Sequence, residues 1–407
     1  MHRFWFALGI AVVVALGAPT AVCARPYVPV PTRFDRRVDA LTARTLLTAP
    51  VQALVDPARQ RAARTITDLR EGMFLVWASA QIYAFFWLWR SGNAARLRDT
   101  IRRRTRSRIT LRATFGAALG LTAPLAGLPF AFVSYRIGFN VGLTEEIIGT
   151  WLVHYALGMI TDAAIGAVLV VVALELVDRT RLWYLAFIVF LYVGIISVAA
   201  IDPVVLSPIV TASQTLHAAA DAPVEVVRAS MRTRMLTART AGIGPFTRIL
   251  LGDVLVGMAT PPEVAFVIAH ENAHVRHADV LKLALIATTL LIFVTAFAVL
   301  IGDRIMFRRD EDAVSRLALV GALVGTLALV AYPLYSAYSR GIEYRADEDA
   351  RHALPNPTGA VRFLVRRADD DMVPLCGRRS TRWYFDSHPA LGARIAAMRG
   401  TTDPCPR

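Results

Sequence analysis

Residues 263–279 read EVAFVIAHENAHVRHAD and contain His270-Glu271-Asn272-Ala273-His274, an H-E-x-x-H motif. The segment holds no Pro or Gly, and an apolar run leads into the motif, so we predict a helix. At 3.6 residues per turn, His270 and His274 lie on one face, where their imidazoles can share one tetrahedral cation. Glu271 then projects beside the cation, as a general base for an attacking water molecule must. The alternative is a polar helix face near a membrane.

The composition is that of a membrane protein. The 407-residue chain is 55% hydrophobic with a mean hydropathy of +0.47, values outside the soluble class. Its net charge of +14 comes from arginines beside apolar runs, where lipid headgroups and membrane orientation account for them. We therefore expect a lipid bilayer and no nucleic acid as partner. Because Lys282 is the single Lys, we infer a GC-rich bacterial genome. The hydrophobic composition then predicts a multi-pass protein of the plasma (inner) membrane.

Six apolar runs are each long enough to cross about 30 Å of hydrocarbon as a helix. They are residues 72–90, 113–133, 149–177, 182–210, 280–302 and 315–339. Residues 1–24 fit a cleavable signal peptide and a first transmembrane helix equally, so six or seven spans are expected. The predicted fold is an all-α polytopic membrane protein with a small α+β catalytic segment.

The predicted division of the chain follows these runs. A polar loop (25–71), four spans (72–210), a catalytic segment (211–279), two spans (280–340) and a C-terminal region (341–407) come after residues 1–24. Arginines crowd the short loops 91–112, 178–181 and 303–314, which the positive-inside rule places in the cytoplasm. The catalytic segment and the C-terminal region then face outward. That orientation permits a disulfide between Cys376 and Cys405, two of only three cysteines.

A catalytic zinc site needs a third protein ligand and one open position. The best candidate is Glu343, in SRGIEYRAD just after the last apolar run. Asp347 lies one helical turn further, where it can accept the second ring N–H of a ligating His. Alone, the two carboxylates would be a solvated acidic face; together with H-E-x-x-H upstream, they favour a metal site.

Several further elements carry a resemblance. HENAH followed by GIEYRADEDA resembles the membrane metalloendopeptidases of the type 1 CAAX prenyl protease family, which are gluzincins. Similar elements are LPF at 128–130 with YRIGFN at 135–140, the Pro-containing 202–208, GIGP at 242–245 followed by TRILLGDVLV, and SHP at 387–389 with Arg394. The matches occur in one order over most of the chain.

The resemblance implies one Zn²⁺ per chain held by His270, His274 and Glu343, and spans arranged around an intramembrane chamber. A peptide substrate would add as a strand along Leu236 to Ala241. There Thr237 replaces the family's usual Asn, which puts one substrate contact in doubt. Positions matching the family assign His388 to the oxyanion. They assign Arg394 to holding Glu343 or its surroundings.

Three other ionisable residues have more than one interpretation. His277 is rotated away from the His270 face and is expected beside the site or on the surface. His154 and Asp162 fall inside a predicted span, where they would face a water-filled cavity or make a helix–helix hydrogen bond.

The expected activity is hydrolysis of peptide bonds by metal-activated water. A heat-shock-type quality-control protease of membrane proteins is the alternative, and a non-catalytic membrane scaffold is the third hypothesis. The natural substrate and the oligomeric state do not follow from the sequence.

Overall fold

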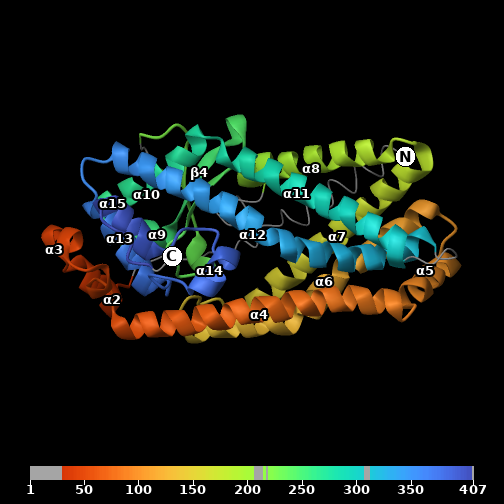
Figure 1. Cartoon of the computed structure of the whole chain (residues 1–407), viewed down its shortest axis with the longest axis horizontal. Coiled ribbons are helices and arrows are strands. Elements are labelled where there is room, and N and C mark those ends of the chain that lie inside the picture. Colours follow the sequence, from red (N-terminus) through yellow and green to blue (C-terminus); the bar gives the residue numbers. More distant parts are fainter. Residues whose placement is uncertain (1–29, 206–213, 217–218, 307–311, 406–407) are drawn as a thin grey trace.

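The molecule is elongated, and its long helices run along the long axis (Figure 1). The computed structural model describes residues 30–205, 214–216, 219–306 and 312–405. The sheet and most short helices gather at one end, and α5 (Asn93–Arg104) lies at the other. The expected signal peptide or first span, residues 1–24, lies outside the described residues.

Six helices in the described part of the chain are long and apolar enough to span a membrane. They are α4 (Pro57–Arg90), α6 (Arg108–Asn140), α7 (Ile148–Arg179), α8 (Trp183–Val205), α11 (Asp279–Ile301) and α12 (Ala313–Ala353). The six predicted spans and the fold class are thereby confirmed. Two boundaries differ usefully from prediction. Helix α4 begins inside the predicted polar loop because Asp56 caps it by accepting from Arg59 N at 2.8 Å, and α12 continues past residue 339 to carry Glu343.

The spanning helices form a ring one helix thick. Each packs against two neighbours, in the order α4, α6, α7, α8, α11, α12 and back to α4. Apolar residues of α5, α6, α7 and α12, among them Phe115 and Ala318, form a buried cluster at the α5 end. At most 17% of the most apolar window of any spanning helix is buried, which suits a thin wall. The chamber inside this ring stays a prediction.

Helices α6 and α7 approach most closely through glycines. A Cβ added at Gly120 would lie 2.2 Å from the Asp162 carbonyl oxygen, and one at Gly116 would lie 2.4 Å from that of Gly166. Small residues thus let the two backbones touch. His154 pairs through Nδ1 with Glu146, in the loop before α7, which is neither of the two partners expected for it, a water-filled cavity or a neighbouring membrane helix.

The sheet has four strands in the order β1-β2-β4-β3. They are β1 (Gln214–Leu216), β2 (Val224–Val227), β3 (Ala238–Ala241) and β4 (Arg248–Gly252). Strand β2 is parallel to β4, while β1–β2 and β3–β4 are antiparallel. Strand β3 is therefore an edge of the described sheet, and it packs against α10 (Pro261–Arg276) and α8. The short helix α9 (Asp253–Met258) follows β4.

A buried arginine connects the N-terminal segment to the core. Arg366, on α13 (Thr358–Asp370), has no exposed surface. It donates to Asp35 of α2 (Arg33–Asp39) at 2.9 Å and to Glu263 of α10 at 2.9 Å. Short helices α3 (Ala43–Thr48) and α15 (Leu391–Arg399) also pack against α13 or its neighbours. A buried charge needs partners of the opposite sign, so the ion pairs of Arg366 with Asp35 and Glu263 fix α2 and α10 relative to one another.

The aspartates at the end of α13 hold three separate segments. Asp369 accepts from Asp56 N at 3.1 and 3.0 Å, and Asp371 accepts from Leu236 N at 2.9 Å, just before β3. Asp370 faces Asp35. Burial, and next the hydrogen bond to Asp35, raises the pKa of Asp370 to about 9. Burial alone would raise the pKa of Asp35 also, but its hydrogen bonds lower it, so the pair shares one proton.

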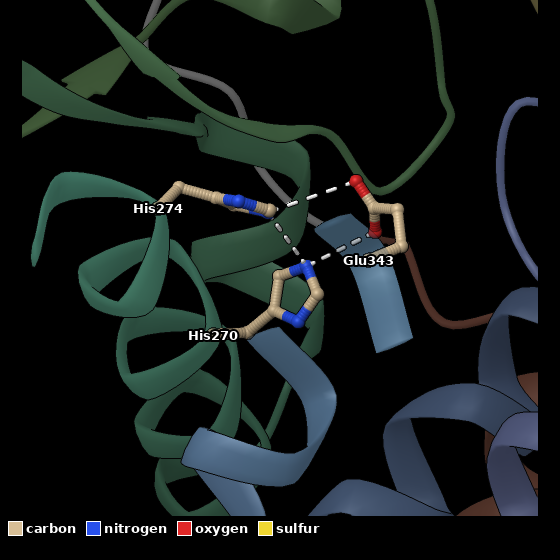
Figure 2. Close-up of side chains that lie close together, drawn as sticks. All are labelled: His270, His274 and Glu343. Carbon is tan, nitrogen blue, oxygen red and sulfur yellow. Dashed lines mark hydrogen bonds and ion pairs between the residues drawn. The ribbon is translucent and has the colours of Figure 1, made fainter. Parts of the chain in front are cut away.

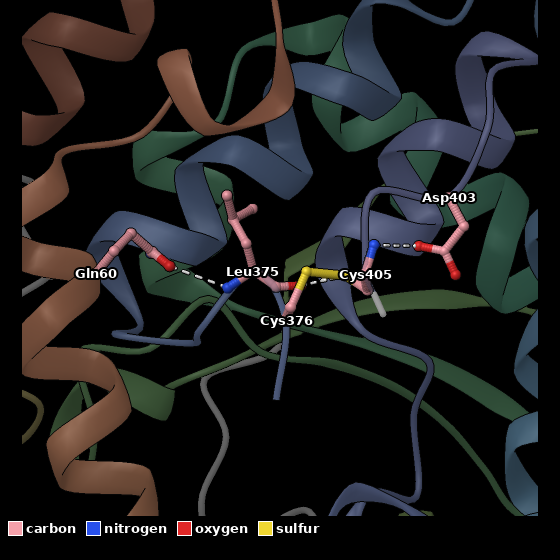
Figure 3. The surroundings of a disulfide bond; sticks show 5 residues. All are labelled: Gln60, Leu375, Cys376, Asp403 and Cys405. Atoms are coloured by element: carbon pink, nitrogen blue, oxygen red, sulfur yellow. Dashed lines mark hydrogen bonds between the residues drawn. A yellow bond between two sulfur atoms is a disulfide. The ribbon is translucent and has the colours of Figure 1, made fainter. Parts of the chain in front are cut away.

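A disulfide joins Cys376 to Cys405 and closes the C-terminal tail over the start of α15 (Figure 3). A Cβ at Gly392 would lie 2.9 Å from Cys405 Sγ, so only glycine fits there. On the other side, Leu375 N donates to Gln60 Oε1 of α4 at 2.9 Å. Residues 375–405, which we call the disulfide lobe, are thus held to the first spanning helix of the described chain.

The shared proton predicts a pH-dependent stability. An aspartate whose pKa is raised from 3.8 to about 9 stays protonated in the folded state while the unfolded state releases its proton. Stability from Asp370 is therefore lost as the pH rises from about 4 to about 9. Asp370→Asn keeps a donor to Asp35 and should stabilise the fold by about 1 kcal/mol or more at pH 8, with a smaller gain at pH 5. Melting in detergent, followed by tryptophan fluorescence, measures this. The exposed Asp303→Asn is the control, and an equal gain at both pH values would contradict the prediction.

Candidate metal centre

Helix α10 presents the H-E-x-x-H motif from a well-capped start. The Glu263 carboxylate accepts from the backbone N–H and the hydroxyl of Thr260 at 2.8 and 2.7 Å, and Pro261 occupies the first turn. The helix ends at Arg276. Ala278 then adopts a left-handed conformation with φ 51°, and α11 starts at once at Asp279. This sharp break turns the chain back beside the motif.

The structure brings His270, His274 and Glu343 together (Figure 2). His270 Nε2 lies 3.3 Å from Glu343 Oε2 and 3.3 Å from His274 Nε2, and His274 Nε2 lies 3.6 Å from Glu343 Oε1. None of the three side chains is more than 11% exposed. Glu343 Oε2 is buried without a hydrogen-bond partner. Two imidazoles and an orphaned carboxylate oxygen are a donor set that fits Zn²⁺.

Each of the two imidazoles has an aspartate at the ring nitrogen that faces away from Glu343. His270 Nδ1 lies 3.0 Å from Asp347 Oδ1, as predicted from the spacing of Asp347 after Glu343. His274 Nδ1 lies 3.0 Å from Asp279 Oδ2. These carboxylates leave both Nε2 atoms directed at the shared site. Asp279 was not predicted from the sequence. The left-handed residue that turns the chain back towards His274 is Ala278, and an alanine does not predict a left-handed turn.

Two arginines complete these pairs. Arg394 donates to both oxygens of Asp347 at 2.7 Å from its Nε and Nη2, and Arg345 Nη2 lies 2.5 Å from Asp279 Oδ1. Arg394 was expected to hold Glu343 or its surroundings; it contacts Asp347, the neighbour of Glu343 by one helical turn. Arg394 is buried, and the desolvation cost of its charge is offset by the bidentate ion pair with Asp347.

Carboxylates also set the protonation of the free site. Burial alone would lower the pKa of His270, but the carboxylates of Asp347 and Glu343 beside its ring raise it to about 9. Without a metal, the imidazole therefore keeps a proton, and a cation must displace that proton to bind.

Of the remaining candidate residues, Glu271 and His388 line the same site, and His277 does not. Glu271 is buried, and its Oε2 accepts from Thr240 Oγ1 of β3 at 2.9 Å. Thr240 was not singled out in the sequence; its hydroxyl links Glu271 to the edge strand. His388 Nε2 lies 3.4 Å from Glu343 Oε1, and its side chain is 58% exposed. His277 pairs with Asp349 at 2.8 Å, away from the ligands, as a partly exposed residue.

A cavity of about 350 Å³ opens over the ligands. Its lining includes residues 235–240, so the edge strand borders the site along with His388 and Arg394. Thr237 lines this cavity too, and its carbonyl accepts from Gly252 N at 2.8 Å. A second cavity of about 520 Å³ lies on the Thr240 side and shares His274 and Val280 with the first.

Comparison with known proteins agrees with this geometry. Residues 209–402 match peptidase family M48. The expected resemblance, to CAAX prenyl protease-like membrane zinc metallopeptidases, is thereby confirmed. The Protease HtpX of Cellvibrio japonicus is 36% identical over 155 residues, covering 34% of this chain and 52% of that protein. The Protease HtpX of Pseudomonas entomophila is 37% identical over 170 residues, covering 37% and 57%.

The fold likeness extends further than the sequence likeness. The crystal structure of S. mikatae Ste24p matches 92% of this chain and 100% of its own with a TM-score of 0.66 at 18% identity. The chain spans about half the length of the curated relatives it matches. Together with the six apolar helices, these likenesses make the chain a multi-pass membrane protein whose residues 209–402 are similar to peptidase family M48.

Removing the support behind one ligand should weaken metal binding. Asp279→Asn leaves His274 without its carboxylate, so Zn²⁺ affinity should fall roughly 10- to 100-fold. Competition with a chromogenic chelator measures this. Asp349→Asn, which removes the partner of the non-ligating His277, is the matched control. Equal affinity in Asp279→Asn and wild type would contradict the role given to Asp279.

Proposed function

We propose that this chain is a membrane-embedded zinc endopeptidase. The observation that carries the proposal is the placement of Glu271 between the ligand cluster and the edge strand β3, within one cavity. Zn²⁺ would be held by His270, His274 and Glu343. When bound, zinc supplies the Lewis acidity that lowers the pKa of a water molecule and polarises a peptide carbonyl.

The protein residues then have separate roles. Glu271 takes the proton of the attacking water and returns it to the leaving amine. Thr240, by its hydrogen bond to Glu271 Oε2, orients that carboxylate. His388 stands at the open side of Glu343 and stabilises the developing oxyanion. Asp347 with Arg394 keeps His270 in the tautomer that leaves Nε2 free for the metal.

The substrate binds along β3 in our proposal. This strand has one unpaired edge among the described strands, and its residues line the cavity above the ligands. A peptide added there would receive main-chain hydrogen bonds that depend little on its sequence. Arg239 projects from the middle of β3 and pairs with Asp202 of α8 at 2.7 Å, which ties the edge strand to the membrane helices.

We propose that the catalytic end faces away from the cytoplasm, in a bacterial inner membrane. The arginines of α5 and of the start of α6 lie at the end of the ring opposite the metal centre. The Cys376–Cys405 disulfide lies against the start of α15, which packs on α12 and α13 at the end of the ring that holds the proposed site, and disulfides persist outside the cytoplasm.

Two alternatives differ in substrate or activity. The HtpX relatives are named proteases, which favours a quality-control protease of membrane proteins as the second candidate. Equal cleavage of an unmodified peptide and its farnesylated form would favour it over a prenyl-specific enzyme. A non-catalytic scaffold is disfavoured because base and ligands occur together.

The role of the base is tested by Glu271→Gln. This isosteric change removes the proton acceptor and leaves the three ligands, so cleavage of casein should fall by at least about 10³-fold. Zinc content by mass spectrometry should stay near one per chain. Undiminished cleavage with full zinc would contradict the mechanism. Asp349→Asn serves as the control for folding and expression.

The orientation is tested by reporter fusions. Alkaline phosphatase, which is active only outside the cytoplasm, should be active when fused after Arg407 and inactive when inserted between α5 and α6 near Arg106. The reverse pattern would contradict the proposed orientation.

A further inference from the structure

A third cavity adjoins the metal site on the His388 side. Its volume is about 280 Å³. Its lining shares Met235, Arg367, His388 and Arg394 with the cavity above the ligands. The rest comes mainly from residues 371–374 and 385–391 and from Thr67 and Arg70 of α4. A peptide lying on β3 can therefore place one of its groups in this cavity while another part lies at the metal.

Arg70 is the unusual group in this wall. It is partly buried, and within the described ranges it makes no hydrogen bond or ion pair. The other two arginines of the cavity are engaged: Arg367 with Asp371 at 3.1 Å and Arg394 with Asp347 at 2.7 Å. A guanidinium that is partly withdrawn from water and has no partner costs free energy. That cost is offset when an anion enters the cavity.

The carboxylates of the cavity do not serve as that anion. Asp371 has no exposed side-chain surface and is taken by Arg367 and by Leu236 N. Burial, with the nearby charge of Glu71, raises the pKa of Asp386 to about 6, and the positive charges of Arg340 and Arg382 act against that rise. Neither aspartate forms an ion pair with Arg70 among the described residues.

We propose that this cavity is a subsite for a carboxylate group of the peptide substrate, and that the guanidinium of Arg70 binds that carboxylate. The inference rests on the proposed function. Backbone pairing along β3 tolerates many sequences, so selectivity must come from cavities that take side chains or chain ends. A guanidinium matches a carboxylate with two parallel hydrogen bonds. The carboxylate belongs either to an acidic side chain or to the free C-terminus of the substrate.

Binding to a variant that does not turn over tests the subsite directly. The full chain carrying Glu271→Gln and loaded with Zn²⁺ is titrated with fluorescein-labelled ten-residue peptides of alanine and valine. In one series a single residue is Glu or Gln, scanned along the peptide. In the other series the C-terminus is a carboxylate or an amide. Fluorescence anisotropy measures affinity.

The expected result is at least a tenfold preference for the carboxylate in one series, which identifies its source. Adding Arg70→Gln should abolish that preference and leave the affinity for the neutral peptide unchanged. Arg64→Gln removes the same charge from an exposed position of α4 and should keep the preference. Equal binding of every matched pair, or a loss by Arg70→Gln that is equal for both members, overturns the subsite.

This outcome is separable from failure of the proposed function. Cleavage of the same peptides is measured with the protein that retains Glu271. Unchanged cleavage by Glu271→Gln would contradict the catalytic mechanism whatever Arg70 does. Cleavage that depends on Glu271 but not on a carboxylate would leave the protease intact and remove only the subsite.

Discussion

The metal centre depends on balanced charge at a buried contact between α10 and α12. Each imidazole of the proposed ligand pair contacts an aspartate, and each aspartate contacts an arginine, in the chains His270–Asp347–Arg394 and His274–Asp279–Arg345. Removing one member of a buried, hydrogen-bonded set leaves its partner uncompensated, at a cost of roughly 3–5 kcal/mol. The centre is therefore rigid before a cation enters it, as a site that must aim two ring nitrogens requires.

This balance joins the membrane and the catalytic segment into one unit. Helix α12 crosses the ring and then supplies Glu343 and Asp347, while α11 begins at Asp279, which backs His274. The separation of the proposed ligands is thus set by how α10, which leads into α11, packs against the spanning helix α12. Helix α4 contributes at its extramembrane start, where Gln60 holds the disulfide lobe and Arg70 lines the neighbouring cavity. Cleavage chemistry would take place at the end of the ring, beside the edge strand.

What could be predicted from the sequence follows its local periodicities. The spacing of His270 and His274 and the long apolar runs are short-range patterns, and the structure agrees with the helix and the spans they indicate. Glu343 was predicted as the third ligand because it follows the last apolar run in a chain that carries H-E-x-x-H upstream, and the resemblance implies the same residue. Asp279, Thr240 and Arg70 were not predicted, because nothing in their local sequence marks them. Asp279 reaches His274 through the left-handed turn at Ala278, and Thr240 contacts Glu271 across the gap between β3 and α10. Arg70 lies on α4, which begins earlier than the apolar run predicts. The sequence also placed Arg394 near the ligands without showing that Asp347, not Glu343, is its direct partner.

The central claim is that one zinc ion is held by two imidazoles and a distant carboxylate. X-ray absorption at the zinc edge on the purified full chain tests it most directly. The account predicts two imidazole nitrogens at about 2.0–2.1 Å, with oxygens at about 2.0–2.2 Å completing the shell, and loss of bound zinc in a His270→Ala, His274→Ala double variant. Sulfur in the shell, or an unchanged spectrum in that variant, would contradict it.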